Sequence, residues 1–358
     1  MAPLLLQLKK HPEAFATTVC LTAQHREMLD RTLEIFDIVP DIDLDLMEPN
    51  QTLHSLTSRV MIEVSRVLEH VKPDLMLVQG DTTTVMTASL AAFYRRVPVG
   101  HVEAGLRTDD PYFPFPEEMN RRLTSALARY HFAPTEMAKQ SLLREGIKSD
   151  QIFVTGNTVI DAQKLILSRP KPPSLERILR SVGVNSEERK LLLVTAHRRE
   201  NFGAPFEEIC RGLKALAERN EDISVLYPVH PNPNVRRPAH RILGNVKGIH
   251  LLEPIEYDAM THLMKDSYFL ITDSGGIQEE APSLGKPVLV LRDKTERPEA
   301  VDAGTAKIIG PRSEAIVREG ERLLRDKEVY RMMAKIISPY GDGRAAERTL
   351  SVLLKGFS

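Results

Sequence analysis

The chain has 358 residues, of which 42% are hydrophobic and 27% are charged, and its formal net charge is -1. These values predict an ordinary globular protein of two domains and give no electrostatic reason to expect nucleic acid or an anionic membrane as a partner. The only cysteines, Cys20 and Cys210, are far apart in apolar surroundings, which argues against a disulfide framework or a metal site and fits a cytoplasmic protein. No apolar run of roughly eighteen residues occurs, so we expect no membrane span.

Short apolar runs alternate with longer amphipathic runs from the beginning of the chain, which predicts repeated β-α-β units and mainly parallel sheets. The first series has strands at residues 16–21, 74–79, 97–102, 130–133 and 152–155, with helices at 55–71 and 83–94. The chain begins at Met1 with a segment that is itself helical in pattern, whereas such a sheet normally begins with its central strand. We therefore expect a gap in the ladder of the first sheet.

A proline-rich segment at residues 169–174, R-P-K-P-P-S, predicts a linker, because proline cannot continue a helix. The second series of strands follows at 190–195, 223–228, 249–251, 268–272, 287–291 and 307–309. The fold class is therefore α/β with two Rossmann-like domains, residues 1–168 and 169–340. Residues 341–358 contain an amphipathic helix that could pack on either domain.

The strongest local signal is T-D-S-G-G-I-Q-E-E-A-P-S-L-G-K-P at residues 272–287. A strand ends before Ser274, and Gly275 and Gly276 then open a helix, so backbone N–H groups at a helix N-terminus are accessible to a diphosphate. Glu280 lies one turn further on, where its carboxylate could accept two ribose hydroxyls. The alternative for this segment is a plain turn with a capping serine.

Three further segments place carboxylates near predicted strand or helix ends in the first domain. Asp81 follows a strand in V-Q-G-D-T-T-T, although it could merely cap the next helix. Glu103 follows another strand in G-H-V-E-A-G-L-R-T, where Gly105 permits an unusual turn. Glu117 and Glu118 occupy the first turn of a helix, where the helix dipole alone could explain them.

The second domain carries cations at strand ends. His197 and Arg198 come directly after a strand in T-A-H-R-R-E-N, and His230 is placed similarly in Y-P-V-H-P-N-P. Arg297 could reach an anion or form a surface ion pair with Glu296 or Glu299. Arginine pairs such as Arg121/Arg122 are scattered, and we expect most of them to be solvated. Carboxylates in one domain and a phosphate site in the other predict an activated sugar in the cleft between the domains.

These motifs together resemble the non-hydrolysing UDP-N-acetylglucosamine 2-epimerases over nearly the whole chain. The resemblance depends on an ordered set of segments: T-A-Q-H-R-E-M-L, G-D-T-T-T, H-V-E-A-G-L-R-T, P-E-E-M-N-R, G-N-T-V-I-D-A, H-R-R-E-N, Y-P-V-H-P-N-P, D-S-G-G-I-Q-E-E-A-P-S-L-G-K-P and E-R-P-E-A-V. It implies a glycosyltransferase-B-like fold, a homodimer, a last helix that returns to the first domain, and no cofactor.

Such enzymes interconvert UDP-N-acetylglucosamine and UDP-N-acetylmannosamine for polysaccharide precursor synthesis, by eliminating UDP to give a glycal and adding it back. The resemblance implies that Asp81, Glu103, Glu117 and His197 are catalytic, with the proton-abstracting carboxylate left open. It implies that UDP is bound by Ser274, Gly275, Gly276, Glu280 and Arg297. It also implies a second, activating substrate site at Gln24, His25, Glu117, Arg198 and His230.

The chain departs from the family pattern at its start. Met1-Ala2-Pro3-Leu4 matches positions that in the family follow a first strand and a G-T-R-P-E loop. Our hypothesis is a start codon placed too late, and we expect the chain as given to have poor stability and little activity. The alternatives are a glycosyltransferase of the same fold, or an inactive protein that binds a nucleotide-sugar.

Overall fold

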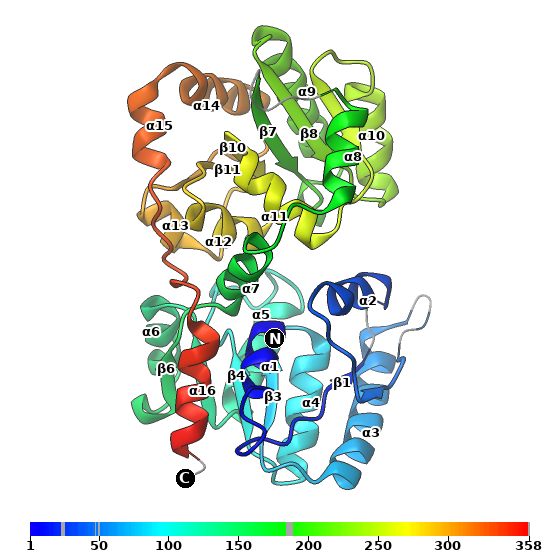
Figure 1. The fold of residues 1–358 in the computed structure, drawn as a ribbon, viewed down its shortest axis with the longest axis vertical. Helices are drawn as coiled ribbons and strands as arrows, with labels where there is room; N and C mark the ends of the chain where they lie inside the picture. Colours follow the sequence, from blue (N-terminus) through cyan, green and yellow to red (C-terminus); the bar gives the residue numbers. More distant parts are fainter. Residues whose placement is uncertain (23–25, 47, 49–50, 184–188, 357–358) are drawn as a thin grey trace. The chain divides into compact units, whose positions relative to one another are not determined.

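The computed structural model describes residues 1–22, 26–46, 48, 51–183 and 189–356. The chain forms two compact units, one made of Met1–Ala162 with Tyr340–Ser358 and the other of Gln163–Pro339 (Figure 1). The division falls within helix α7 (Thr158–Leu167) and thus before the expected linker. Part of that linker is helical, since α8 (Pro173–Ser181) begins within it. A proline is tolerated as the first residue of a helix, because its missing N–H would have no partner there.

The first unit contains two separate parallel sheets. Strands β1 (Cys20–Leu21) and β2 (Ile42–Asp43) pair only with each other, whereas β3 (Met76–Gln79), β4 (Val99–Val102), β5 (Tyr130–Ala133) and β6 (Ile152–Val154) follow one another in order. In the described part of the chain no strand joins the two sheets. The interruption expected in this ladder is therefore present, and β3 has a neighbour on one side only.

The helices of the first unit are α1 (Ala2–Leu8), α2 (Arg26–Ile35), α3 (Leu53–Val71), α4 (Thr83–Tyr94), α5 (Glu117–Leu127), α6 (Glu136–Arg144), α7, α16 (Ala345–Gly356) and the 3-10 turn η1 (Ser149–Gln151). Apolar residues recur on α3 at Leu56, Val60, Val64 and Leu68, a helical period that buries one face against α4. Helix α1 packs on α16, where Leu4 and Leu8 share a core with residues of the sheet.

The second unit has a six-stranded parallel sheet in the order β12-β11-β10-β7-β8-β9. Its strands are β7 (Lys190–Thr195), β8 (Ile223–Pro228), β9 (Ile249–Leu252), β10 (Phe269–Thr272), β11 (Val288–Val290) and β12 (Ala306–Ile308). Besides α8, its helices are η2 (Arg199–Asn201), α9 (Ala204–Arg219), α10 (Pro233–Leu243), α11 (Tyr257–Asp266), α12 (Gly275–Ser283), α13 (Pro298–Asp302), α14 (Ser313–Arg325) and α15 (Lys327–Met333).

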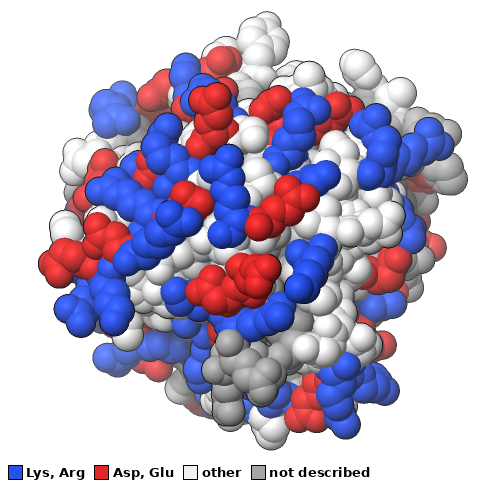
Figure 2. All heavy atoms as spheres, turned by 90° about the horizontal axis from the view of Figure 1, so that it is seen from above, with Lys and Arg blue, Asp and Glu red and all other residues white. Residues whose placement is uncertain are grey.

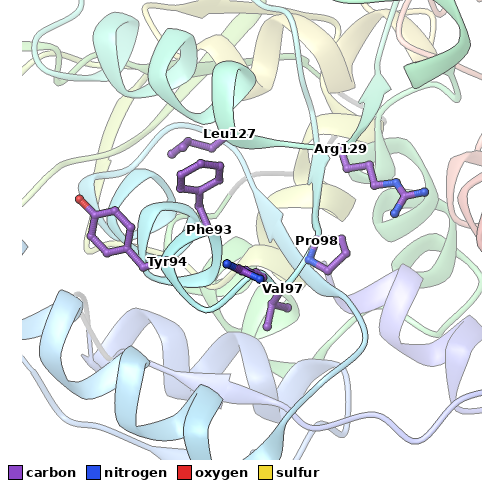
Figure 3. A pocket seen from close by; sticks show the side chains of 7 residues that line it. Phe93, Tyr94, Val97, Pro98, Leu127 and Arg129 are labelled. Atoms are coloured by element: carbon purple, nitrogen blue, oxygen red, sulfur yellow. The ribbon is translucent and has the colours of Figure 1, made fainter.

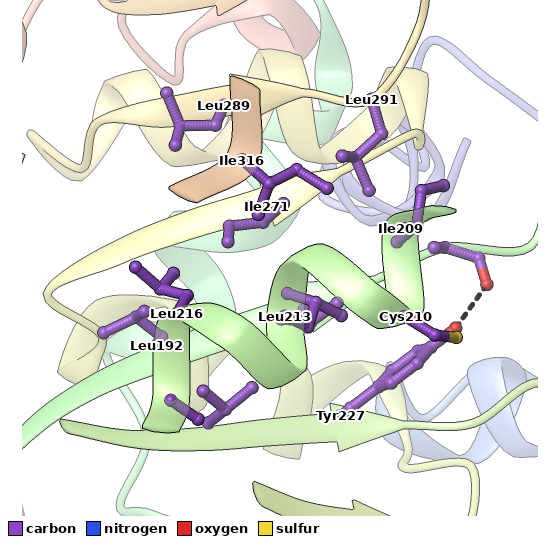
Figure 4. Close-up of a cluster of buried hydrophobic side chains, with 14 of the residues drawn as sticks. Leu192, Ile209, Cys210, Leu213, Leu216, Tyr227, Ile271, Leu289, Leu291 and Ile316 are labelled. Carbon is purple, nitrogen blue, oxygen red and sulfur yellow. Dashed lines mark hydrogen bonds between the residues drawn. The ribbon is translucent and has the colours of Figure 1, made fainter. Parts of the chain in front are cut away.

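The core of this unit shows why the sheet is parallel. Strands β7 and β10 are apolar along nearly their whole length and buried, as expected for strands covered by helices on both faces. Figure 4 shows α9 contributing Ile209, Leu213 and Leu216 against them, at helical spacing. The strand order reverses between β7 and β10, and in open parallel sheets ligands bind at the carboxyl ends of the strands at such a point.

On the face in Figure 2, lysine and arginine are interspersed with aspartate and glutamate, so that face has no large patch of one sign. None of the helices in the described ranges combines the length and apolar character needed to cross a bilayer.

Candidate functional site

The predicted phosphate-binding turn, Ser274–Gly276, lies where the strand order of the second unit's sheet reverses; we call it the phosphate turn. Strand β10 ends at Thr272, Ser274 is the N-cap of α12, and its hydroxyl does not cap the helix. A Cβ on Gly276 would have no neighbour closer than 3.9 Å, whereas a Cβ on Gly275 would lie 3.0 Å from a carboxylate oxygen of Glu296. Gly276 thus leaves the helix N-terminus open to an anion, and Gly275 is required by packing.

Glu280 is buried on the same helix, with only 5% of its surface exposed. Burial raises the pKa of its carboxyl to about 8, against a hydrogen bond of 2.6 Å donated by the Tyr257 hydroxyl to Oε1. No motif in the sequence identifies Tyr257, because its helix α11 lies outside the segments with a recognisable pattern. This tyrosine holds the carboxyl in one orientation at the site predicted for ribose.

Arg297 was expected either to reach an anion or to form a surface ion pair with Glu296 or Glu299; the pair with Glu296 forms, but it is buried and not at the surface. The side chain is buried, and its Nε lies 2.6 Å from Oε1 of Glu279 and its Nη1 3.3 Å from Oε1 of Glu296. Its guanidinium carbon is 3.5 Å from where a Cβ on Gly275 would lie. Arg297 therefore packs against the phosphate turn. Burial by itself would raise the pKa of Glu296, but the charges of Arg297 and Arg292 lower it to about 2.

The loop that carries His197 and Arg198 begins where β7 ends, beside the phosphate turn. Thr195 is in register with Thr272, and their hydroxyls are 2.6 Å apart. The His197 ring stacks on that of His230, with centroids 5.3 Å apart and planes inclined by 18°. The structure therefore brings the predicted histidines of the second unit together at the carboxyl edge of its sheet.

In the first unit, Asp81 is not the cap of the following helix. The N-cap of α4 is Thr82, whose hydroxyl accepts from the Val85 N–H. The Asp81 carboxylate instead accepts from Arg121, with Nε at 2.9 Å and Nη2 at 2.6 Å from the same oxygen. Asn120 donates to the Asp81 carbonyl at 2.9 Å. Helix α5 thus holds both the backbone and the side chain of Asp81.

Arg121 is therefore an exception to the expectation that most of these arginines are solvated. It is 4% exposed and also donates to Glu118 at 3.1 Å. Neighbouring arginines on a helix face different ways, so one of them can be buried while Arg122 is half-exposed. No pattern in the sequence identifies which, because the partner Asp81 lies 40 positions away.

Glu103 follows β4 at the same edge, since Gln79 and Val102, the last residues of β3 and β4, are in register. Gln79 donates from Nε2 to Oε2 of Glu103 at 3.4 Å. Glu103 has a φ of 65°, a left-handed conformation that costs free energy in a residue other than glycine and is found disproportionately at functional sites. The expected unusual turn is confirmed at Gly105, where φ is 93° and a Cβ would lie 2.3 Å from the Ala138 carbonyl oxygen.

The two adjacent glutamates of α5 have different environments. Glu118 is fully buried and accepts hydrogen bonds from the Thr108 N–H, Arg121 and Arg122, so its role is structural. Oε2 of Glu117 is buried and has no hydrogen-bond partner among the described residues. A buried acceptor without a partner is costly unless a ligand or water supplies a donor, which distinguishes Glu117 from a residue that only complements the helix dipole.

Part of the predicted second substrate site lies outside the described residues, namely Gln24 and His25. Its other members are described: Arg198 and His230 in the second unit and Glu117 in the first. In the described part of the chain no group of three or more histidine, cysteine, aspartate or glutamate side chains could hold a metal ion.

A cavity of about 500 Å³ in the first unit lies away from these residues (Figure 3). Pro98 and Arg129, which line it, precede β4 and β5, so it opens at the amino ends of these strands. Asp81 and Glu103 follow the carboxyl ends. Because ligands of parallel sheets bind at the carboxyl edge, this cavity is not the predicted active site.

Comparison with known proteins gives one consistent family. Residues 6–354 match the family model described as UDP-N-acetylglucosamine 2-epimerase. The UDP-N-acetylglucosamine 2-epimerase of Escherichia coli K12 is 53% identical over 357 residues, covering 99% of this chain and 94% of that protein. The crystal structure of UDP-GlcNAc 2-epimerase from Neisseria meningitidis bound to UDP-GlcNAc is 50% identical, with a TM-score of 0.94 over 99% of this chain and 96% of that one.

A more distant structure has the same fold. UDP-GlcNAc 2-epimerase from Methanocaldococcus jannaschii, in complex with UDP-GlcNAc and UDP, is 33% identical with a TM-score of 0.83, covering 99% of this chain and 96% of that one. The predicted fold, two Rossmann-like domains of the glycosyltransferase-B type, is confirmed by these likenesses.

Proposed function

This chain belongs to the UDP-N-acetylglucosamine 2-epimerase family, and on that premise we propose how its two units divide the work of the reaction. It is an isomerase that interconverts UDP-N-acetylglucosamine and UDP-N-acetylmannosamine through a glycal. In our proposal the second unit binds UDP and the first unit supplies the carboxylates that move the proton at carbon two.

The α12 N-terminus is the observation that carries this proposal. Ser274 and Gly276 leave backbone N–H groups open to a diphosphate, and buried Glu280 and Arg297 lie on or against the same turn. During elimination the C1–O bond breaks, and its electron pair goes to the β-phosphate oxygen. Donors fixed in advance at that oxygen stabilise the departing UDP and keep it in place for re-addition.

Asp81, Glu103 and Glu117 form the proposed acid/base group. The C2–H bond breaks as the C1=C2 double bond forms, so the proton passes to a carboxylate while UDP departs. Re-addition requires a proton to be delivered to the opposite face of carbon two, which calls for more than one carboxyl group. The ion pair between Asp81 and Arg121 and the unpartnered oxygen of Glu117 support distinct roles for these acids.

Incubation with UDP-N-acetylglucosamine alone in D₂O tests the function. We expect UDP-N-acetylmannosamine with deuterium at carbon two, observed by proton NMR without any acceptor. A glycosyltransferase would give no mannosamine isomer, and a hydrolysing epimerase would release free N-acetylmannosamine and UDP. UDP binding by calorimetry without turnover would instead indicate an inactive binding protein.

We also propose that the chain forms a homodimer in the cytoplasm. Exposed apolar side chains on α4 and α5 support a protein contact there: Phe93, Tyr94, Met119 and Leu123 are 58%, 68%, 38% and 45% exposed. Light scattering would give the mass, and Phe93→Asp with Leu123→Asp should yield a monomer. An unchanged mass in this double variant would place any dimer contact elsewhere.

A further inference from the structure

Asp273 is a buried carboxylate between the end of β10 and the phosphate turn. It is fully inaccessible to solvent, and its Oδ2 accepts from three donors: the His197 N–H at 2.9 Å, the Arg198 N–H at 2.8 Å and the Asn201 side-chain amide at 3.0 Å. Three donors around one oxygen suit the acceptor capacity of a carboxylate. Asp273 thus connects the phosphate turn to the loop that follows β7.

The other oxygen of this carboxylate faces the imidazole of His197. Oδ1 has no hydrogen bond within the described structure and lies 3.8 Å from Nδ1 of His197. Stacking on His230 fixes the plane of the His197 ring. Because the two nitrogens of an imidazole point to different sides, a ring with Nδ1 toward Asp273 directs Nε2 away from it.

We propose that Asp273 is a positioning residue for His197. Its Oδ2 fixes the backbone of the loop, and its Oδ1 accepts the Nδ1–H of His197, so that Nε2 donates to a diphosphate at Ser274–Gly276. This inference rests on the proposed function and on the catalytic role expected for His197, which here assists the departure of UDP. When the C1–O bond breaks, its electron pair goes to the β-phosphate oxygen, and the hydrogen bond from Nε2–H stabilises that charge; Nε2 keeps its hydrogen while UDP departs and adds back.

The charges around His197 fit a histidine that becomes a cation only with its ligand. Burial lowers the pKa of His197, and the nearby charges of His230 and Arg198 lower it further, whereas Asp273 and Glu200 act in the opposite direction. A bound diphosphate adds negative charge on the Nε2 side and favours the imidazolium. Without the Asp273 carboxylate, only Glu200 and the ligand would oppose the effects of burial, His230 and Arg198 on the pKa of His197.

Asp273→Asn separates positioning of the ring from packing of the loop. The amide oxygen can still accept backbone N–H groups, but the amide nitrogen in place of Oδ1 is a donor and favours an unprotonated Nδ1. We expect the affinity for UDP to fall, because the imidazolium and the diphosphate stabilise each other, and kcat to fall on the order of 10- to 1000-fold. Nitrogen-15 NMR of the UDP complex should show Nδ1–H at His197 in the native chain and its loss in the variant, with a lower pKa.

Tyr227→Phe is the matched control, because Tyr227 supports the backbone where the same loop begins. Its hydroxyl donates to the Ala196 carbonyl at 2.7 Å (Figure 4). We expect a lower Tm with the His197 tautomer and kcat retained. Equal losses of kcat in both variants, with unchanged tautomers, would reduce Asp273 to a structural role and overturn the proposal.

The NMR measurement on the native chain does not depend on any variant folding or on turnover. With UDP bound, a His197 that carries its proton on Nε2 alone, with Nδ1 bare, would overturn the proposal. Asp273→Asn combined with His197→Asn should lower kcat no more than His197→Asn alone, whereas additive losses would contradict it. If the native chain makes no mannosamine isomer, the proposed function fails, and the tautomer still decides whether Asp273 positions the ring.

Discussion

The acidic residues of the first unit differ in their partners more than in their position along the chain. Asp81 and Glu118 share the buried guanidinium of Arg121, while Glu117 has a carboxylate oxygen without a partner in the described structure. The ion pair with Arg121 holds the Asp81 carboxylate in one orientation. The environment of each of these carboxylates therefore depends on one or two hydrogen bonds or ion pairs.

Arg121→Gln tests the importance of that guanidinium. The variant leaves buried Glu118 with hydrogen bonds from Arg122 and the Thr108 N–H but without the charge of Arg121. We therefore expect a loss of ~3 kcal/mol in the free energy of unfolding. We also expect kcat to fall on the order of 10- to 100-fold as Asp81 loses its orientation. Denaturant unfolding and steady-state kinetics measure the two effects.

The control is Arg66→Gln, which breaks an exposed i,i+3 pair with Glu63 on α3 and should cost ~0.5 kcal/mol or less. Similar destabilisation by both variants would show that the Arg121 pair is not buried in solution.

Glu280 predicts a pH dependence of stability. Burial raises the pKa of its carboxyl from 4.5 to about 8. Because the folded-state pKa is above the unfolded value, its stabilising contribution is fully present below about pH 4.5 and is lost as the pH rises through about 8. Glu280→Gln does not titrate, so between pH 5 and 8 the native chain should lose on the order of a few kcal/mol relative to it.

Denaturant unfolding at several pH values measures this difference. Tyr257→Phe removes the hydrogen bond that lowers the Glu280 pKa and should move the transition to higher pH. A difference between the native chain and Glu280→Gln that does not vary with pH would contradict the prediction.

At the scale of elements, helix α12 depends on two adjacent glycines for different reasons. Gly276→Ala adds a methyl group with no neighbour closer than 3.9 Å, so it should leave Tm unchanged. UDP affinity should fall by about tenfold or more, because the methyl group would lie where we propose that the diphosphate binds. Gly275→Ala would place a methyl group 3.0 Å from Glu296 and should lower Tm as well. Calorimetry and thermal unfolding of both variants measure this, and a Tm loss for Gly276→Ala alone would refute the assignment.

Helix α16 is joined to the rest of the first unit by Asp161. The carboxylate of Asp161 accepts hydrogen bonds from the Ala345 and Ala346 N–H groups at 3.1 and 2.8 Å. Asp161→Ala removes a partner for two buried backbone donors and should cost ~1–2 kcal/mol in denaturant unfolding. Asp342→Ala is the control, because it breaks an exposed pair with Arg348 close to the same helix end and should cost ~1 kcal/mol or less. The reverse order of these losses would contradict a capping role for Asp161.

At the scale of the whole molecule, the first unit has two parallel sheets and the second has one, and each unit has its own core. Arg198 and His230 of the second unit and Glu117 of the first belong to the predicted activating site. If that site exists, UDP-N-acetylmannosamine alone should be converted slowly and with a lag that added UDP-N-acetylglucosamine removes. Initial rates with one substrate and with both measure this, and hyperbolic curves of equal rate would rule out activation.

Local sequence predicted most of the elements. Strands β5, β7 and β8 and helix α4 have the predicted bounds. The spacing of apolar residues along each segment shows which element it forms, and this spacing can be read from neighbouring residues alone. The two-residue strand β2 was missed, since so short a segment has no period. The carboxylates at strand ends and the glycine turn were also identifiable, because a parallel sheet places successive strand ends at one edge.

Only the tertiary structure decided which partner each site residue has. Arg121 reaches Asp81 across 40 positions and Asp273 reaches His197 across 76, and a sequence records residue types but no long-range distances. Composition, motifs and strand order thus determined the fold class and the family by themselves. The burial of Arg297, the raised pKa of Glu280 and the carboxylate beside His197 were decided by packing, because hydrogen bonds and desolvation depend on groups that only folding brings together.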